Sequence, residues 1–116
     1  MFARLDVCCA LLILAQLLPA NAGSRVYDGI EAEALHCAAE FSYTAQALSQ
    51  RGLMSDHHRD VATRTTQYLL ENYVSGSFDD KFGAFEVALA RLPVDDLDQV
   101  RASVRHLGHC EKQFLQ

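Results

Sequence analysis

The sequence has no stretch in which apolar and polar residues alternate with the period of two that marks a half-buried β-strand. It also has no apolar run of the roughly 20 residues that a transmembrane helix needs. The longest apolar segment, from Val7 to Leu18, is about 12 residues long and lies near the N-terminus. The first absence predicts an all-α protein, and the second argues against a membrane span.

Basic residues are too few and too scattered for a protein that binds phosphate backbones. The chain has 10 lysines and arginines against 15 aspartates and glutamates, and its net charge is -5 with neutral histidines. A protein that binds nucleic acid or an anionic membrane surface needs a basic stripe or cluster, and this sequence has none. We therefore expect neither as a partner.

Several catalytic and cofactor motifs are missing as well. The sequence lacks C-x-x-C, C-x-x-C-H, a glycine-rich phosphate loop and a nucleophile elbow, so dithiol redox chemistry and covalent haem attachment are not expected. The titratable residues at 56–60 are consecutive at a predicted helix start and point in different directions, so they cannot converge on one substrate. We expect no enzymatic activity. A noncovalent haem between Met54 and His106 or His109 is a minor alternative, because Met54 falls in a predicted turn.

The N-terminal segment has the features of a cleavable signal peptide. Arg4 precedes the apolar segment, Pro19 ends it, and Ala20 and Ala22 supply the small residues that signal peptidase requires. Cleavage after Ala22 leaves residues 23–116, which suffice for one hydrophobic core but not for two. We therefore expect residues 1–22 to be a signal peptide, residues 23–116 to be a helical domain, and the mature protein to be periplasmic or extracellular.

Four amphipathic segments follow, and residues that begin or end helices separate them. The first opens at Asp28, where Glu31 is placed to form a capping box, and Gly52 offers a left-handed stop. The second opens at Ser55 and ends in a loop at 75–77. The third runs from residue 78 to the proline at 93, and the fourth starts in the acidic cluster at 95–98.

Apolar residues recur in these segments at steps of three and four, which predicts one buried face on each helix. Phenylalanines at this spacing are typical core residues. Short turns between amphipathic helices favour antiparallel neighbours, so we predict a small antiparallel four-helix bundle. The residues expected to be buried are Ile30, Ala34, Cys37, Phe41, Ala45 and Leu48; Val61, Tyr68, Leu69 and Tyr73; Phe78, Phe82, Phe85, Leu89 and Leu92; and Leu97, Val100, Val104, Leu107, Cys110 and Phe114.

Cys37 and Cys110 remain after the expected signal cleavage, because the other two cysteines lie in the signal peptide. Both fall on apolar stripes, and in an antiparallel bundle the start of the first helix lies beside the end of the fourth. An isolated pair in an exported protein is expected to form a structural disulfide. Closing this loop of about 73 residues should stabilise the fold by roughly 4 kcal/mol.

Three histidines lie near the predicted bridge. His36 precedes Cys37, His109 precedes Cys110, and His106 lies one turn before His109. Facing antiparallel helices place His36 and His109 on the same side. Together with His106 they form a candidate site for zinc, copper or nickel. With reduced thiols, the two His-Cys pairs form a zinc set that competes with the disulfide. The alternative is that these histidines lie at a solvated boundary and bind no metal.

The leading functional expectation is a small exported non-enzymatic protein that binds another protein, as inhibitors, immunity proteins and chaperones do. It rests on a compact helical surface, a mild acidic balance and the lack of a catalytic set. The alternative is a bundle that binds a metal ion or, less favoured by the sequence, haem. Apolar residues beyond the stripes, Leu53, Val87 and Val94, either fill the core or mark a homodimer face.

Overall fold

The computed structural model describes residues 25–116. This part of the chain folds into four α-helices, and no β-strand occurs within it. The helices are α2 (Gly29–Gln50), α3 (Asp56–Tyr73), α4 (Phe78–Ala90) and α5 (Leu97–Phe114). The predicted all-α, four-helix architecture is therefore confirmed. The expected signal peptide, residues 1–22, and its cleavage site lie outside the described residues.

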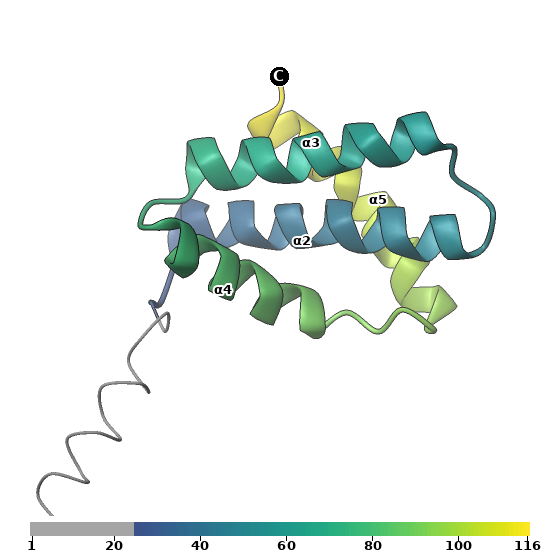
Figure 1. Cartoon of the computed structure of the whole chain (residues 1–116), viewed down its shortest axis with the longest axis horizontal. Coiled ribbons are helices and arrows are strands. Elements are labelled where there is room, and N and C mark those ends of the chain that lie inside the picture. The colour runs from purple at the N-terminus through teal and green to yellow at the C-terminus, as the bar shows by residue number, and fades with distance from the viewer. Residues whose placement is uncertain (1–24) are drawn as a thin grey trace, which may run out of the picture.

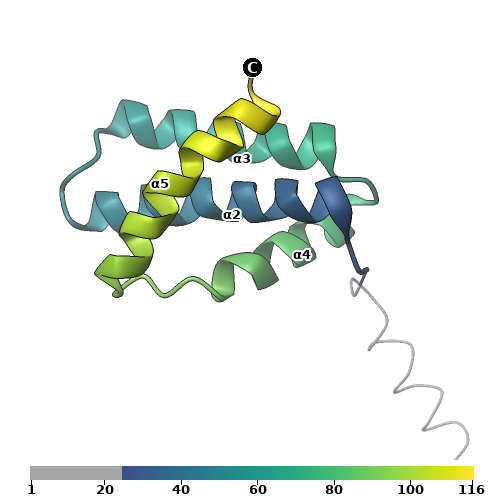
Figure 2. The ribbon, with the colours of Figure 1, turned by 180° about the vertical axis from the view of Figure 1, so that it is seen from behind.

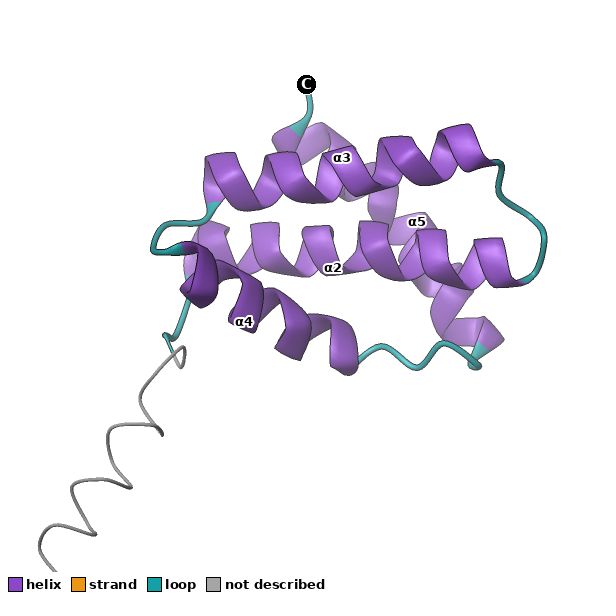
Figure 3. Cartoon of the chain, viewed as in Figure 1, coloured by secondary structure: helices purple, strands orange, loops and turns teal. Residues whose placement is uncertain are grey.

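The helix α2 is the centre of the fold and packs against each of the other three (Figure 1). In the two ribbon views α3 runs antiparallel to α2 along one side, and α4 lies along the other side. The last helix, α5, crosses α2 obliquely; it lies behind α2 in the view of Figure 1 and in front of it in Figure 2. Loops connect all the helices (Figure 3). The predicted four-helix packing thus takes the form of three helices around a fourth, in which α3 is antiparallel to α2, α4 runs in the same direction as α2 and α5 is oblique to it (Figure 1).

The residues of α2 explain its central position. Beyond the predicted stripe it buries Leu35, Ala38, Ala39, Tyr43 and Ala47, so apolar residues surround most of its circumference. A helix that is apolar all round is stable only when neighbours cover it on several sides. Its many alanines also allow those neighbours to approach closely.

Helix boundaries agree with the predicted caps, and Asp28 is the N-cap residue of α2 as expected, but the capping bonds predicted there are missing. Ser55 accepts a hydrogen bond from the His58 amide at 3.2 Å, and Gly52 adopts a φ of 69°. The expected capping box at Asp28 does not form, because the side chain of Asp28 makes no capping bond. Glu31 instead accepts a hydrogen bond from the Ser75 amide at 2.7 Å, and the bonds from Ser75 lower the pKa of the Glu31 carboxyl. This carboxylate therefore ties α2 to the α3–α4 loop.

The N-terminal described residues are fastened to that same loop. Arg25 donates a hydrogen bond to the Ser75 hydroxyl, and the Tyr27 hydroxyl donates to the Ser75 carbonyl, both at 2.7 Å. Gly76 has a φ of 102°, and a Cβ there would lie 3.0 Å from the Tyr27 hydroxyl. A glycine is required at this position for both reasons.

The predicted disulfide joins Cys37 of α2 to Cys110 of α5, with a Cα–Cα distance of 5.8 Å. Both cysteines are buried in the main core cluster, together with Leu69 of α3, Phe85 of α4 and Phe114 of α5. A second cluster forms around Tyr43, whose hydroxyl donates to the Pro93 carbonyl at 2.7 Å. The bridge fits an oxidising compartment. None of the four helices has the length and hydropathy of a membrane span.

Seven residues expected in the core are instead exposed by 40% or more: Ile30, Val61, Tyr68, Phe78, Phe82, Leu97 and Val104. Periodicity identifies residues that share a helix face, but a face is buried only where another helix covers it. In α3 the buried face turns out to contain Ala62, Thr66 and Leu69. Of the additional apolar residues, Leu53 and Val87 are exposed, and Val94 packs against the second core cluster.

Candidate functional site

The most unusual buried residue is Glu40 in the middle of α2. Only 3% of Glu40 is exposed, and its sequence neighbours Ala39 and Phe41 belong to the main core cluster. A carboxylate removed from water is destabilising unless positive charges, hydrogen bonds or a metal ion compensate for it. The groups around this carboxylate therefore indicate what the site can do.

Two histidines contact one oxygen of Glu40. His36 lies one helical turn earlier on α2, and its Nε2 is 3.2 Å from Oε1 of Glu40. His106 reaches the same oxygen from α5 through its Nδ1. The nitrogen and oxygen atoms of the three side chains lie within 4.8 Å of one another. Two imidazoles and a carboxylate thus converge from two helices on one point.

The disulfide explains why these residues meet. Glu40 follows Cys37 by three residues on α2, and His106 precedes Cys110 by four residues on α5. Residues three or four apart lie on the same helix face, one turn away. Where the bond brings the two cysteines together, the adjacent turns of the two helices also face each other, and these turns contain Glu40 and His106.

The cluster extends from the core to the surface. The side chain of Glu40 is 4% exposed, whereas those of His106 and His36 are 37% and 54% exposed. On the solvent side lies a hollow of about 300 Å³, lined by both histidines and by Glu33, His109 and Gln113. The side-chain amide of Gln113 donates a hydrogen bond to Glu33. An ion can therefore reach the histidines from solvent while the carboxylate stays in the interior.

The structure places all three predicted histidines around this hollow but gives them different positions. His36 approaches His106, with 5.3 Å between ring centroids. His109, expected to face His36, instead stacks on His106 at 5.1 Å, and it is exposed. The histidine that reaches the buried oxygen is therefore His106, and His109 lies outside the set of three converging groups.

Sequence reasoning missed Glu40. A signal was present, because this glutamate lies four residues after His36 and three after Cys37, next to a stripe of apolar residues. An acidic residue so close to a cysteine that is predicted to be buried is a candidate metal ligand.

A second cluster adjoins the first and shares His106 with it. The Sγ of Cys110 is 3.7 Å from the Nδ1 of His106. The ligand atoms of Cys37, His106 and Cys110 lie within 4.8 Å of one another. In the oxidised protein the two sulfurs are bonded to each other, so this cluster offers a metal only its imidazole.

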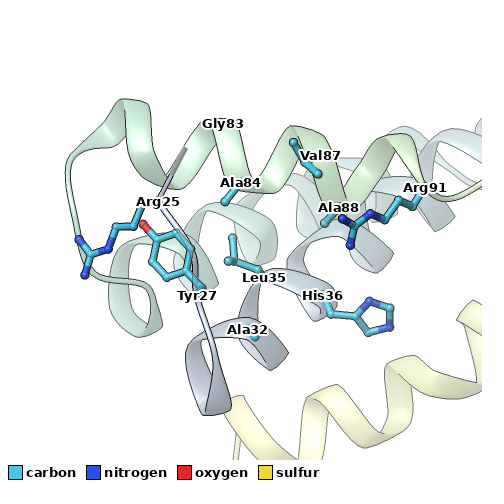
Figure 4. A pocket seen from close by; sticks show the side chains of 10 residues that line it. All are labelled: Arg25, Tyr27, Ala32, Leu35, His36, Gly83, Ala84, Val87, Ala88 and Arg91. Atoms are coloured by element: carbon cyan, nitrogen blue, oxygen red, sulfur yellow. The ribbon is translucent and has the colours of Figure 1, made fainter. Parts of the chain in front are cut away.

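His36 also lines a hollow of about 370 Å³ on the α4 side of the molecule (Figure 4). Arg25 and Tyr27 lie at one end of this hollow, and His36 and Arg91 lie at the other (Figure 4). Burial is the main cause that raises the pKa of the Tyr27 hydroxyl, so this group remains a neutral donor. His36 thus lines both this hollow and the one beside His106.

An exposed aromatic pair forms a separate feature on α4. Phe78 is 74% exposed and stacks on Phe82, with 5.4 Å between ring centroids and 11° between the ring planes. Together with Leu70 and Glu71 of α3 and Lys81 of α4 they line a hollow of about 280 Å³. Large exposed aromatic groups beside a concave surface are typical of contact sites for other molecules.

The residues considered for haem do not share one site. Met54 lies beyond the C-terminal end of α2, whereas His106 contacts Glu40. Gln50, the last residue of α2, lies ten residues after Glu40, which corresponds to a rise of about 15 Å at 1.5 Å per residue. Met54 is therefore too far from His106 for both to ligate one iron.

Comparison with known proteins returns no relative. No protein family matches this chain. No curated protein matches it in sequence, and no solved structure matches it in fold.

Proposed function

We propose that this chain is a small exported, non-enzymatic protein that binds one divalent transition-metal ion through His36, Glu40 and His106. The observation that carries the proposal is the buried Oε1 of Glu40, which lies 3.2 Å from Nε2 of His36 and also contacts Nδ1 of His106. In the absence of a metal, polar contacts with the same histidines satisfy the buried carboxylate. The site is therefore compatible with both the metal-free and the metal-bound protein.

The ligand types select the class of ion. Two imidazole nitrogens and one carboxylate oxygen suit Zn²⁺, Cu²⁺ or Ni²⁺, whereas Mg²⁺ and Ca²⁺ prefer sites made of oxygen alone. Ligand atoms around a tetrahedral zinc ion lie about 3.3 Å apart when the metal–ligand distances are near 2.0–2.1 Å. The His36–Glu40 distance of 3.2 Å is close to this value. Water from the adjacent hollow would complete the coordination.

Zinc titration of the oxidised protein tests the proposal. We expect one ion per chain and, at a free zinc concentration of 100 times Kd, about 2.7 kcal/mol of added stability against unfolding. Glu40→Gln keeps the size of the side chain but removes its charge, and it should weaken binding by about 100-fold. Calorimetry measures the affinity, and a thermal melt with and without zinc measures the stabilisation.

Two further variants complete this experiment. His57→Ala removes an exposed histidine from α3 and should leave the affinity unchanged. His109→Ala should weaken binding far less than His106→Ala, because His109 only stacks on His106. Equal affinities for the wild type and Glu40→Gln would overturn the proposed site.

A second candidate function, the binding of another protein, is supported by the aromatic pair on α4. Phe78 and Phe82 expose apolar surface next to Glu71 and Lys81, so the surface combines aromatic anchors with charges of both signs. Aromatic residues are enriched among the residues that dominate protein–protein binding. This function does not exclude metal binding, because the two features involve different residues.

Phe78→Ser combined with Phe82→Ser should abolish partner binding through this surface. Because Phe78 is 74% exposed and Phe82 is 40% exposed, we expect the free energy of unfolding to fall by no more than about 2 kcal/mol. The measurement compares partners recovered by the wild type, by this variant and by Val87→Ser, a control at another exposed apolar residue of α4. A partner retained by the double variant would contradict this role, and sedimentation of the purified chain shows whether the partner is a second copy.

A further inference from the structure

We propose that the reduced protein has a second metal site, in which the thiolates of Cys37 and Cys110 and the imidazole of His106 bind zinc. The proposal deepens the proposed function, because the two sites share His106. The disulfide would then determine which of two overlapping ligand sets is available: nitrogen and oxygen ligands in the oxidised protein, or two sulfurs and one nitrogen in the reduced protein.

The distances among these three residues favour the thiolate site. In a tetrahedral zinc site, Zn–S distances of about 2.3 Å and Zn–N distances of about 2.0–2.1 Å place a sulfur and a nitrogen ligand about 3.5 Å apart. The Sγ of Cys110 already lies 3.7 Å from the Nδ1 of His106. Once the S–S bond is broken, the two sulfurs can separate to the roughly 3.8 Å that zinc ligation requires. Small side-chain rotations therefore suffice.

Glu40 can provide the fourth ligand. Its carboxylate contacts the Nδ1 of His106, the same atom that lies near the Sγ of Cys110. The cysteines and Glu40 are all buried, so a bound ion would be shielded from water on that side. Thiolates are softer ligands than carboxylates, and they favour zinc and monovalent copper over harder ions.

The chemistry of the exchange balances with a dithiol as reductant. The dithiol transfers two hydrogens to the sulfurs of Cys37 and Cys110 and is itself oxidised to a disulfide. When zinc binds, the two thiols lose their protons to solvent, and two Zn–S bonds form. Each chain is synthesised with both thiols reduced, so zinc binding and disulfide formation compete for the same sulfurs before the bridge closes.

Cobalt titration of the oxidised and the reduced protein tests the inference. Co²⁺ substitutes for Zn²⁺, and thiolate ligands add a sulfur-to-cobalt charge-transfer band in the near ultraviolet. The protein is reduced with a dithiol, and the dithiol is then removed under anaerobic conditions. Competition between cobalt and zinc then gives the zinc affinity. We expect the reduced wild type to show the band and to bind zinc at least about tenfold more tightly than the oxidised protein. The oxidised protein should show no band.

Two variants separate this site from the proposed oxidised site. Cys37→Ala/Cys110→Ala, measured after the same treatment, should show no band and should bind zinc no more tightly than the oxidised wild type. His106→Ala should keep both thiols but lose at least about tenfold in zinc affinity. Circular dichroism of each sample checks that the helices remain folded.

The possible outcomes distinguish the two proposals. No band in the reduced wild type, or equal zinc affinities for reduced wild type and reduced His106→Ala, would overturn the thiolate site and leave the oxidised site untouched. A band in the reduced protein without zinc binding by the oxidised protein would support the thiolate site and remove the proposed function.

Discussion

Replacing both bridging cysteines, Cys37→Ala/Cys110→Ala, should lower the free energy of unfolding by about 4 kcal/mol. The bond joins residues 73 positions apart in sequence, and a loop of this length restricts the unfolded chain strongly. A domain of this size has roughly 5–14 kcal/mol of total stability, so the loss is a large part of it. The melting temperature should fall by on the order of 20 °C.

Urea unfolding of the wild type, the double variant and the reduced wild type measures this effect. The reduced wild type in a metal chelator should unfold near the midpoint of the double variant, because both lack the same constraint. A double variant within about 1 kcal/mol of the oxidised wild type would show that the bond adds little to stability.

Leu69→Ala should lower the free energy of unfolding by about 3 kcal/mol, within the range for buried leucines. Leu69 is fully buried, and it is the apolar residue of α3 that reaches deepest into the main core cluster around α2. Truncation removes its apolar contacts and leaves a cavity beside the alanines of α2. Alanine side chains have no alternative rotamers, so they cannot move to fill the cavity.

Leu53→Ala is the matched control for this substitution, because Leu53 is 69% exposed in the loop after α2. It should change the free energy of unfolding by no more than about 0.5 kcal/mol. Both variants are compared with the wild type by urea unfolding under oxidising conditions. Similar losses for the two variants would contradict the central position of Leu69 in the core.

The candidate site depends on the disulfide, because the bond sets the register of α5 against α2. The cysteines fix which turn of α5 faces which turn of α2, and the turns next to them contain Glu40 and His106. Loss of the bridge therefore removes a constraint that holds the imidazole at the carboxylate. Stability and metal affinity should both respond to the redox state of one bond.

Much of the helix pattern could be predicted because its causes are local. Ser55 and Gly52 act through hydrogen bonds and backbone angles within a few residues of themselves, so their neighbours in sequence suffice to predict their roles. At Asp28 the predicted helix start is confirmed, but the predicted capping box is wrong. There the acidic partner expected for the capping box, Glu31, bonds to Ser75, which lies 44 residues away.

Burial was less predictable than helix position. Phe78 and Phe82 have ideal helical spacing, yet they are exposed, because α4 packs on α2 with another face. Conversely, Ala38 and Ala39 of α2 lie outside its predicted stripe and are fully buried. A period of 3.6 residues describes one helix at a time, whereas burial depends on how many neighbours surround it.

By itself, the amino-acid sequence determined the all-α class, four helices with most of their ends, and the pairing of Cys37 with Cys110. These follow from periodicity, capping residues and the number of cysteines outside the N-terminal segment, all of which are properties of residues near one another in sequence or of composition. Only the tertiary structure decided that α2 is central, that Phe78 and Phe82 of α4 face solvent while Phe85 is buried, and that Glu40 meets His106. Those results depend on which surfaces of distant segments touch, and no local pattern contains that information.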